Sequence, residues 1–194
     1  SGINLSDDSS CCVATGYGRI SVPYADKTVT EITCHALGAV HLFQHPDLTV
    51  IDIGGQDTKI IQIEQGFVKD FIMNDKCAAG TGRFLEVMAN TLSLRPNEMF
   101  DLARLGSDTT ISSMCTVFAE SEVIGLIGKG EPKENIAYAV VNSTIRKVAA
   151  QVSRMNGEMF TFCLTGGLCE CDYIREALSK ELGKDVFSCP DARY

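Results

Sequence analysis

The sequence contains no apolar run of the roughly 20 residues that a membrane-spanning helix needs, so no such helix is expected. It is also short of basic residues: 17 lysines and arginines stand against 25 aspartates and glutamates, which gives a net charge of −8. That balance argues against a nucleic-acid-binding surface and against binding to an anionic membrane. Residues Ser1–Ser10 lack the basic start and apolar core of a secretory signal, so a cytoplasmic location is predicted. Tryptophan is absent, and its absence excludes nothing.

Several common binding motifs are missing as well. Neither a Walker A loop nor a complete G-x-G-x-x-G fingerprint is present, so nucleotide binding of those two types is not indicated. The nine cysteines include no Cys-x-x-Cys pair, and therefore no two of them form that chelating unit. In a reducing cytosol such thiols are structural, catalytic or metal-binding rather than disulfide-bonded.

Apolar periodicity predicts an α/β fold, because helices and strands alternate after a central hairpin. Strands are predicted at Leu48–Ile53, Lys59–Glu64, Phe67–Met73, Phe160–Thr165 and Val186–Ser188. Helices are predicted at Glu31–Phe43, Arg83–Leu92, Asn97–Leu105, Val117–Ile127, Glu134–Met155 and Tyr173–Leu182. Cys11 and Cys12, in a short apolar stretch, are expected to fill the core. His35 and His41 are expected to be ordinary helical residues with no metal role.

Two glycine-rich turns indicate phosphate binding. Asp52 ends a buried strand, and Gly54, Gly55, Gln56 and Asp57 follow it. Glycine lets backbone N–H groups approach an anion closely, and an aspartate at a strand end can hold a hydrated Mg²⁺ or orient a water molecule. The alternative for this turn is a tight hairpin with no ligand.

The segment Gly80-Thr81-Gly82 leads into a helix, and a helix N-terminus is another place where an anion can bind.

Cys77 and Cys115 each stand at the head of a predicted helix, where partial positive charge favours a thiolate or an anionic cluster. A cubane iron–sulfur cluster needs four thiolates, so one chain with two would supply half of the ligands and a two-fold dimer would supply all of them. The alternative is that both are structural thiols. Cys169 and Cys171 form a Cys-x-Cys segment, which is either a binding site for a soft metal ion or a loop with two incidental thiols.

Taken together, these segments resemble the ATP-dependent activators of 2-hydroxyacyl-CoA dehydratases, within the BadF/BadG/BcrA/BcrD ATPase family that also includes benzoyl-CoA reductase subunits. The resemblance rests on Thr15–Arg19, Asp52–Asp57, Asn74–Phe84, Ser112–Glu122 and Thr165–Gly167, and so covers nearly the whole chain. It implies the ribonuclease H-like fold shared by actin, Hsp70 and sugar kinases.

The resemblance also implies a function: electron transfer driven by ATP. In the family, ATP binds with Mg²⁺ between two lobes, and one [4Fe–4S] cluster bridges a homodimer through two cysteines of each subunit. The cluster then passes one electron to the dehydratase, which is the protein partner. Cys77 and Cys115 match the cluster ligands. The implied catalytic residues are Asp52 and Gln56, and the implied ATP/ADP-binding residues are Asp52, Gly54, Gly55, Gln56, Asp57, Gly80, Thr81, Gly82, Gly166 and Gly167. An oxygen-sensitive cluster implies an anaerobic setting.

The family pattern opens with a strand–DxGS/T–strand phosphate loop, and no such segment precedes Cys11; a closing segment after the last strand is missing too. We therefore expect residues 1–46 to be a remnant of the first lobe and residues 47–194 to form the second lobe. Whether this chain alone hydrolyses ATP stays open. Two further functions also stay open: a small-molecule kinase acting on amino sugars, and a non-catalytic metal-cluster scaffold. The acyl-CoA pathway cannot be inferred, because its substrate binds the partner.

Overall fold

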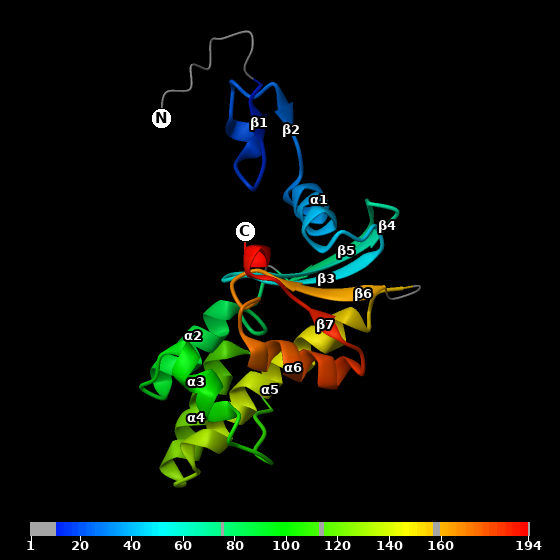
Figure 1. Cartoon of the computed structure of the whole chain (residues 1–194). Helices are drawn as coiled ribbons and strands as arrows, with labels where there is room; N and C mark the ends of the chain where they lie inside the picture. The colour runs from blue at the N-terminus through cyan, green and yellow to red at the C-terminus, as the bar shows by residue number, and fades with distance from the viewer. Residues whose placement is uncertain (1–10, 75, 113–114, 157–159, 194) are drawn as a thin grey trace.

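The computed structural model describes residues 11–74, 76–112, 115–156 and 160–193. Its centre is a five-stranded mixed sheet of order β5-β4-β3-β6-β7, with helices on both faces (Figure 1). The strands of this sheet are β3 (Leu48–Ile53), β4 (Thr58–Glu64), β5 (Phe67–Asn74), β6 (Thr161–Thr165) and β7 (Val186–Phe187). β3 pairs antiparallel with β4 and parallel with β6, so β3 joins the hairpin half of the sheet to the parallel half.

The helices begin and end within a few residues of the predicted positions. They are α1 (Glu31–Phe43), α2 (Gly82–Thr91), α3 (Pro96–Ala103), α4 (Thr116–Gly128), α5 (Lys133–Val152) and α6 (Asp172–Leu182), with short 3₁₀ turns η1 (Arg19–Ser21) and η2 (Pro190–Arg193). Local signals explain two of these limits. The Thr30 side chain accepts a hydrogen bond from the Thr33 N–H at the start of α1, and Gly183 ends α6 in the left-handed conformation.

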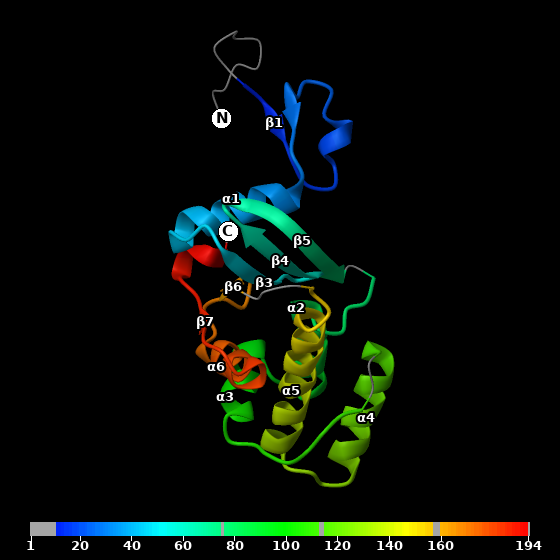
Figure 2. The same ribbon diagram turned by 90° about the vertical axis from the view of Figure 1, so that its right-hand side faces the viewer.

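Two hydrophobic cores lie on opposite faces of the sheet. Val50 and Ile61 contribute to the smaller core beneath α1, whereas Ile51 and Ile60 contribute to the larger core that the other helices cover. Because both faces are covered, β3 is buried at every position and shows no alternation of polar and apolar residues. Figure 2 shows that α5 runs away from the sheet, with α4 alongside it. In the described ranges no helix is both long and apolar enough to cross a membrane.

A small parallel pair, β1 (Val13–Ala14) with β2 (Lys27–Thr28), lies beyond the N-terminal end of α1 and apart from the main sheet (Figure 1). The expectation that Cys11 and Cys12 fill the core is wrong, since Cys11 is exposed and Cys12 is only partly buried. A two-residue strand pair that stands away from the other layers has no core to fill. The division of the chain at residue 46 stays a prediction.

Candidate functional site

The turn between β3 and β4 is open to solvent but anchored at its base. The Gly54 N–H donates a 3.0 Å hydrogen bond to the Asp57 carbonyl, which closes the turn. Gly55 and Gln56 are exposed at its tip, whereas Asp52, at the end of β3, is only 5% exposed. The turn therefore presents backbone groups to solvent above a buried carboxylate, which suits an anion accompanied by a metal ion.

Lys59, buried in β4, holds the acidic groups of this turn together. Its Nζ lies 2.9 Å from Asp57 Oδ2, 3.3 Å from Asp52 Oδ2 and 3.2 Å from Glu31 Oε1 on α1. Burial by itself lowers the pKa of Lys59, but the hydrogen bond to Asp57 and the charge of Asp52 outweigh burial and raise that pKa well above its usual value. A permanent cation thus fixes the orientation of the Asp52 carboxylate.

A second glycine turn lies beside the first. β6 runs parallel to β3 with Thr165 opposite Asp52, so the two strands end at the same edge of the sheet. The Thr165 hydroxyl donates to Asp52 Oδ1 over 3.3 Å. Gly166 follows with a φ of +84°, and a Cβ at this position would overlap Asp52 Oδ1. Ligands of open α/β sheets bind at such strand ends, so this edge is the candidate site.

His35, which the sequence analysis treated as an ordinary helical residue, contacts this edge. Its Nε2 lies 2.8 Å from Thr165 Oγ1, and its Nδ1 lies 3.9 Å from Asp52 Oδ2. Because the Thr165 hydroxyl donates to Asp52, the hydrogen in the His35–Thr165 bond comes from His35 Nε2. His35 is therefore a packed helical residue, as predicted, but its contacts also show that α1 supplies part of the site.

A cavity of about 510 Å³ opens next to Gly167, on the helical side of the same edge. Its walls include Phe100, Arg104, Tyr173 and Arg193. The Arg104 guanidinium lies 5.1 Å from the centre of the Tyr173 ring, a cation–π arrangement that stabilises both side chains. A planar aromatic group linked to a phosphate at the glycine turns could stack on the aromatic side chains of this cavity and contact its arginines.

The two candidate metal ligands stand in different settings. Cys115 is the N-cap residue of α4, which confirms its predicted place at a helix start, and it is exposed. The same prediction is wrong for Cys77, because Thr81 is the N-cap of α2 and a loop separates it from Cys77. Both segments nevertheless meet, since Gly80 and Ser112 line one cavity of about 500 Å³. Among the described residues no group of three or more histidine, cysteine, aspartate or glutamate side chains is arranged to hold a metal.

The loop that follows Cys77 is clamped by polar side chains. Asn74 Nδ2 donates to the Cys77 carbonyl at 2.9 Å and to the Ala79 carbonyl at 3.2 Å. The Thr58 hydroxyl donates to the Gly80 carbonyl at 2.7 Å from the base of the first glycine turn. The loop is therefore fixed against the sheet edge rather than free.

The start of α2 is bonded directly to the first glycine turn. The Gly82 N–H donates to the Gly54 carbonyl at 2.9 Å, and the Arg83 N–H donates to the Gly55 carbonyl at 2.8 Å. Thr81 is buried, and its N–H donates to the Ala78 carbonyl. These N–H groups are used within the protein, and the contact of Gly80-Thr81-Gly82 with an anion stays a prediction. Their place in the fold is to support the turn.

Comparisons with known proteins decide the family. The BadF/BadG/BcrA/BcrD ATPase family matches residues 1–194. The chain belongs to this family. It is 45% identical over 193 residues to the (R)-2-hydroxyglutaryl-CoA dehydratase activating ATPase of Acidaminococcus fermentans, covering 97% of this chain and 72% of that protein. It is 43% identical over 187 residues to the activator of lactoyl-CoA dehydratase of Anaerotignum propionicum, covering 95% of this chain and 71% of the relative.

Solved structures of dehydratase activators share the fold. The Acidaminococcus fermentans (R)-2-hydroxyglutaryl-CoA dehydratase component A superposes with a TM-score of 0.85 at 44% identity, covering 94% of this chain and 70% of that one. The activator of the 2-hydroxyisocaproyl-CoA dehydratase from Clostridium difficile, with bound ADPNP, gives 0.81 at 38% identity, covering 92% and 66%. The predicted α/β ATPase fold is confirmed.

Sequence reasoning about this family member missed Glu31, His35, Lys59 and the bonding role of Thr165. One signal was available: Lys59 is a charged residue inside a strand that is buried from Thr58 to Ile63, and a lysine there needs carboxylate partners. The contribution of α1 had no comparable signal, because Glu31 and His35 look like solvent-facing helical residues until the helix is placed on the sheet.

Proposed function

We propose that this member of the BadF/BadG/BcrA/BcrD ATPase family is an ATP-dependent electron-transfer activator of a 2-hydroxyacyl-CoA dehydratase or a related reductase. Relatives named as dehydratase activators at 43–45% identity support the activator role. The observation that carries the proposal is the pair of backbone bonds from Gly82 and Arg83 to Gly54 and Gly55. These bonds join the predicted phosphate turn to the segment that follows Cys77, so a change at one is transmitted to the other.

The nucleotide would lie along the edge formed by the two glycine turns. The Gly54–Asp57 turn would hold phosphates, with Asp52 positioned for a hydrated Mg²⁺ and Gln56 exposed toward the attacking water. Gly166 and Gly167 would face the adenosine, whose base fits the cavity between Arg104 and Arg193. Bound ADPNP in the relative from Clostridium difficile supports nucleotide binding.

The cysteines fit half of a [4Fe–4S] ligand set. Cys115 is exposed at the N-terminus of α4, and the Lys147 ammonium lies 3.7 Å from Cys77 Sγ, so a negatively charged cluster would meet positive charge at both cysteines. A cubane cluster held there supplies one low-potential electron. A homodimer with one pair of thiols from each subunit would complete the set.

The start of α4 offers a surface for that dimer. Val117 and Phe118, in the first turn of α4 after Cys115, are 66% and 67% exposed, and Ile124 further along the helix is 56% exposed. Large apolar side chains grouped on one helix indicate a protein contact. A second copy of the chain, with its own Cys115, would cover the Val117 and Phe118 end. An exposed bridging cluster is oxygen-labile, so an anaerobic cytoplasmic setting stays part of the proposal.

The test is iron and sulfide analysis with native mass measurement on anaerobically purified protein. We expect about four irons and four sulfides per two chains, and loss of both in Cys77→Ala and Cys115→Ala. Cys12→Ala is the matched control, because Cys12 lies in the separate β1–β2 unit, and it should retain the cluster. A metal-free monomer, or iron retained in both variants, would contradict the proposal. A small-molecule kinase of the same fold would keep its activity in Cys77→Ala.

A further inference from the structure

Lys147, on the face of α5 toward the sheet edge, is built into the loop that follows Cys77. Its Nζ lies 3.7 Å from Cys77 Sγ. Its aliphatic stem packs beneath Gly80: a Cβ on Gly80 would lie 3.2 Å from Lys147 Cδ and 3.4 Å from Cγ. Gly80 also has a φ of +90°, a conformation that glycine adopts without strain. Because Gly80 has no side chain, the Lys147 stem packs against the loop, and its ammonium reaches the Cys77 sulfur.

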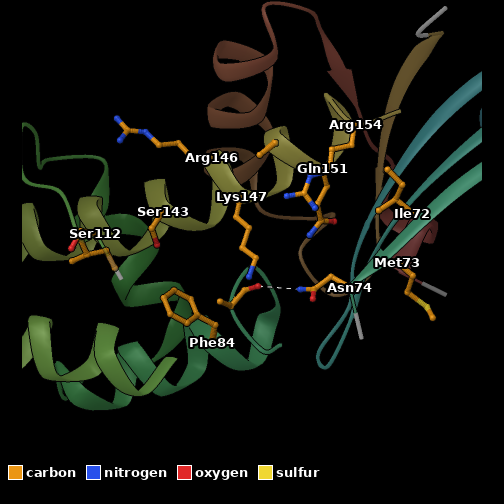
Figure 3. Close-up of a pocket in the computed structure, with 14 residues that line it drawn as sticks. Ile72, Met73, Asn74, Phe84, Ser112, Ser143, Arg146, Lys147, Gln151 and Arg154 are labelled. Carbon is orange, nitrogen blue, oxygen red and sulfur yellow. Dashed lines mark hydrogen bonds between the residues drawn. The ribbon is translucent and has the colours of Figure 1, made fainter. Parts of the chain in front are cut away.

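No carboxylate competes for this ammonium in the part of the chain that the structure describes. The ion pairs there leave out Lys147, and its hydrogen bond goes to the Cys77 sulfur. Arg146 and Arg154 line the same cavity of about 500 Å³ and add positive charge. Figure 3 shows Lys147 extending from α5 toward the loop that Asn74 binds, whereas its neighbour Arg146 points elsewhere. The sulfur of Cys77 therefore faces a specific, unneutralised cation.

We propose that Lys147 is a positioning residue that holds the Cys77 sulfur and, by its charge, raises the reduction potential of the cluster bound there. The part about the cluster rests on the function proposed above. A nearby positive charge stabilises the reduced form, which carries one more negative charge than the oxidised form, and charge is one of the factors that set cluster potentials. The alternative is that Lys147 only fills space beneath Gly80.

Lys147→Met separates these roles, because methionine keeps most of the stem and removes the charge. Lys147→Gln removes the charge with a different side chain and serves if the methionine variant fails to fold. Lys147→Arg keeps the charge. Lys133→Met is the matched control: it removes one lysine charge from the same helix, roughly 21 Å away at 1.5 Å per residue, where Lys133 Nζ donates to the Leu92 carbonyl.

The first readout is the midpoint potential of the anaerobic iron-loaded protein, followed by electron paramagnetic resonance during a redox titration. We expect a more negative potential in Lys147→Met and Lys147→Gln. Lys147→Arg and Lys133→Met should keep the wild-type value. An unchanged potential in Lys147→Met, or an equal shift in Lys133→Met, overturns the proposal.

The second readout needs no cluster, so it separates failure of this inference from failure of the proposed function. In protein stripped of iron, the rate of Cys77 alkylation is measured by mass spectrometry with anionic iodoacetate and with neutral iodoacetamide. The ratio of the two rates reports local charge, because the thiolate fraction cancels. Lys147→Met should lower that ratio about five-fold, the effect of one unit charge at about 4 Å in water. A ratio equal to wild type shows that Lys147 does not act on this sulfur by charge.

Discussion

Lys59 Nζ lies 2.9 Å from Asp57 Oδ2, in a lysine side chain that is only 4% exposed. The same ammonium also pairs with Asp52 and Glu31, so one buried cation contacts carboxylates from β3, from the turn and from α1. Removing Lys59 leaves the Asp52 carboxylate, which is only 7% exposed, without this cation, and that costs far more than losing a surface pair. The turn that we assign to phosphate binding therefore depends on a residue outside it.

Lys59→Met should lower the free energy of unfolding by about 3–5 kcal/mol, as expected when one partner of a buried ion pair is removed. The measurement is urea unfolding followed by circular dichroism. Lys69→Met is the control: Lys69 pairs with Glu64 at 2.7 Å, but both side chains are 43% exposed, and the expected loss is below about 1 kcal/mol. Equal losses of unfolding free energy in the two variants would mean that the buried ion pairs of Lys59 stabilise the fold no more than an exposed pair does.

The same network predicts an alkaline dependence. The pKa of Lys59 is raised by folding, so its stabilising effect is complete below the unfolded value of about 10.5 and is lost as the pH rises toward the folded value. The stability difference between wild type and Lys59→Met should therefore be constant from pH 7 to 9 and shrink above pH 10.5. A difference that shrinks below pH 9 instead would point to another group.

Gly166→Ala should destabilise the fold. Alanine at a φ of +84° is strained, and its Cβ would overlap Asp52 Oδ1, so a loss of about 2 kcal/mol or more is expected. For a chain of this size that corresponds to a fall in melting temperature of roughly 4 °C or more. Gly167→Ala is the neighbouring control, since nothing lies within 4 Å of a Cβ there. Thermal unfolding of both variants without nucleotide makes the comparison, and similar melting temperatures would refute the close packing of the two turns.

Thr58→Val should weaken the attachment of the loop after Cys77 to the sheet, because valine has nearly the shape of threonine but no hydroxyl group. It removes the buried hydroxyl that donates to the Gly80 carbonyl at 2.7 Å, and we expect a loss of about 1–2 kcal/mol in unfolding free energy. Thr144→Val is the matched control: the Thr144 hydroxyl oxygen is buried with no hydrogen-bond partner among the described residues, so this change should be neutral or stabilising. Equal destabilisation by both substitutions would mean that the hydrogen bond from Thr58 to the Gly80 carbonyl does not stabilise the loop.

Thiol reactivity should follow exposure. In metal-free protein, iodoacetamide should modify the exposed Cys115 rapidly and Cys163 hardly at all, because burial and then the charge of Cys189 raise the pKa of Cys163 to about 12. Peptide mass spectrometry after timed alkylation measures both. Loading with iron and sulfide should protect Cys77 and Cys115, whereas Cys12 should react at the same rate in both states. Unprotected Cys115 in iron-loaded protein would exclude it as a ligand.

Strand and helix positions could be predicted because local signals were strong. Thr30 marks the start of α1 and Gly183 the end of α6, and both act within one turn of the chain. The turn after Asp52 was also visible, because aspartate and paired glycines follow an apolar strand. Its closeness to Gly166 came from the resemblance and not from the residues, since no local pattern says that β6 pairs with β3.

Contacts between distant segments explain what could not be predicted. Lys59, His35 and Lys147 acquire their roles only when β4, α1 and α5 are packed around the sheet edge. The placement of Cys77 at a helix start failed for a related reason. The N–H groups of Gly82 and Arg83 bond to the glycine turn, and this pairing sets where α2 begins.

The central claim is that the Gly54–Asp57 turn and the loop that follows Cys77 are coupled through two backbone hydrogen bonds, from Gly82 to Gly54 and from Arg83 to Gly55. The most direct test is the electron paramagnetic resonance spectrum and midpoint potential of reduced, iron-loaded protein, measured with and without Mg²⁺ and ADPNP. The account predicts that saturating nucleotide changes both. Nucleotide binding confirmed by calorimetry, with an unchanged spectrum and potential, would contradict it and leave two independent sites on one fold.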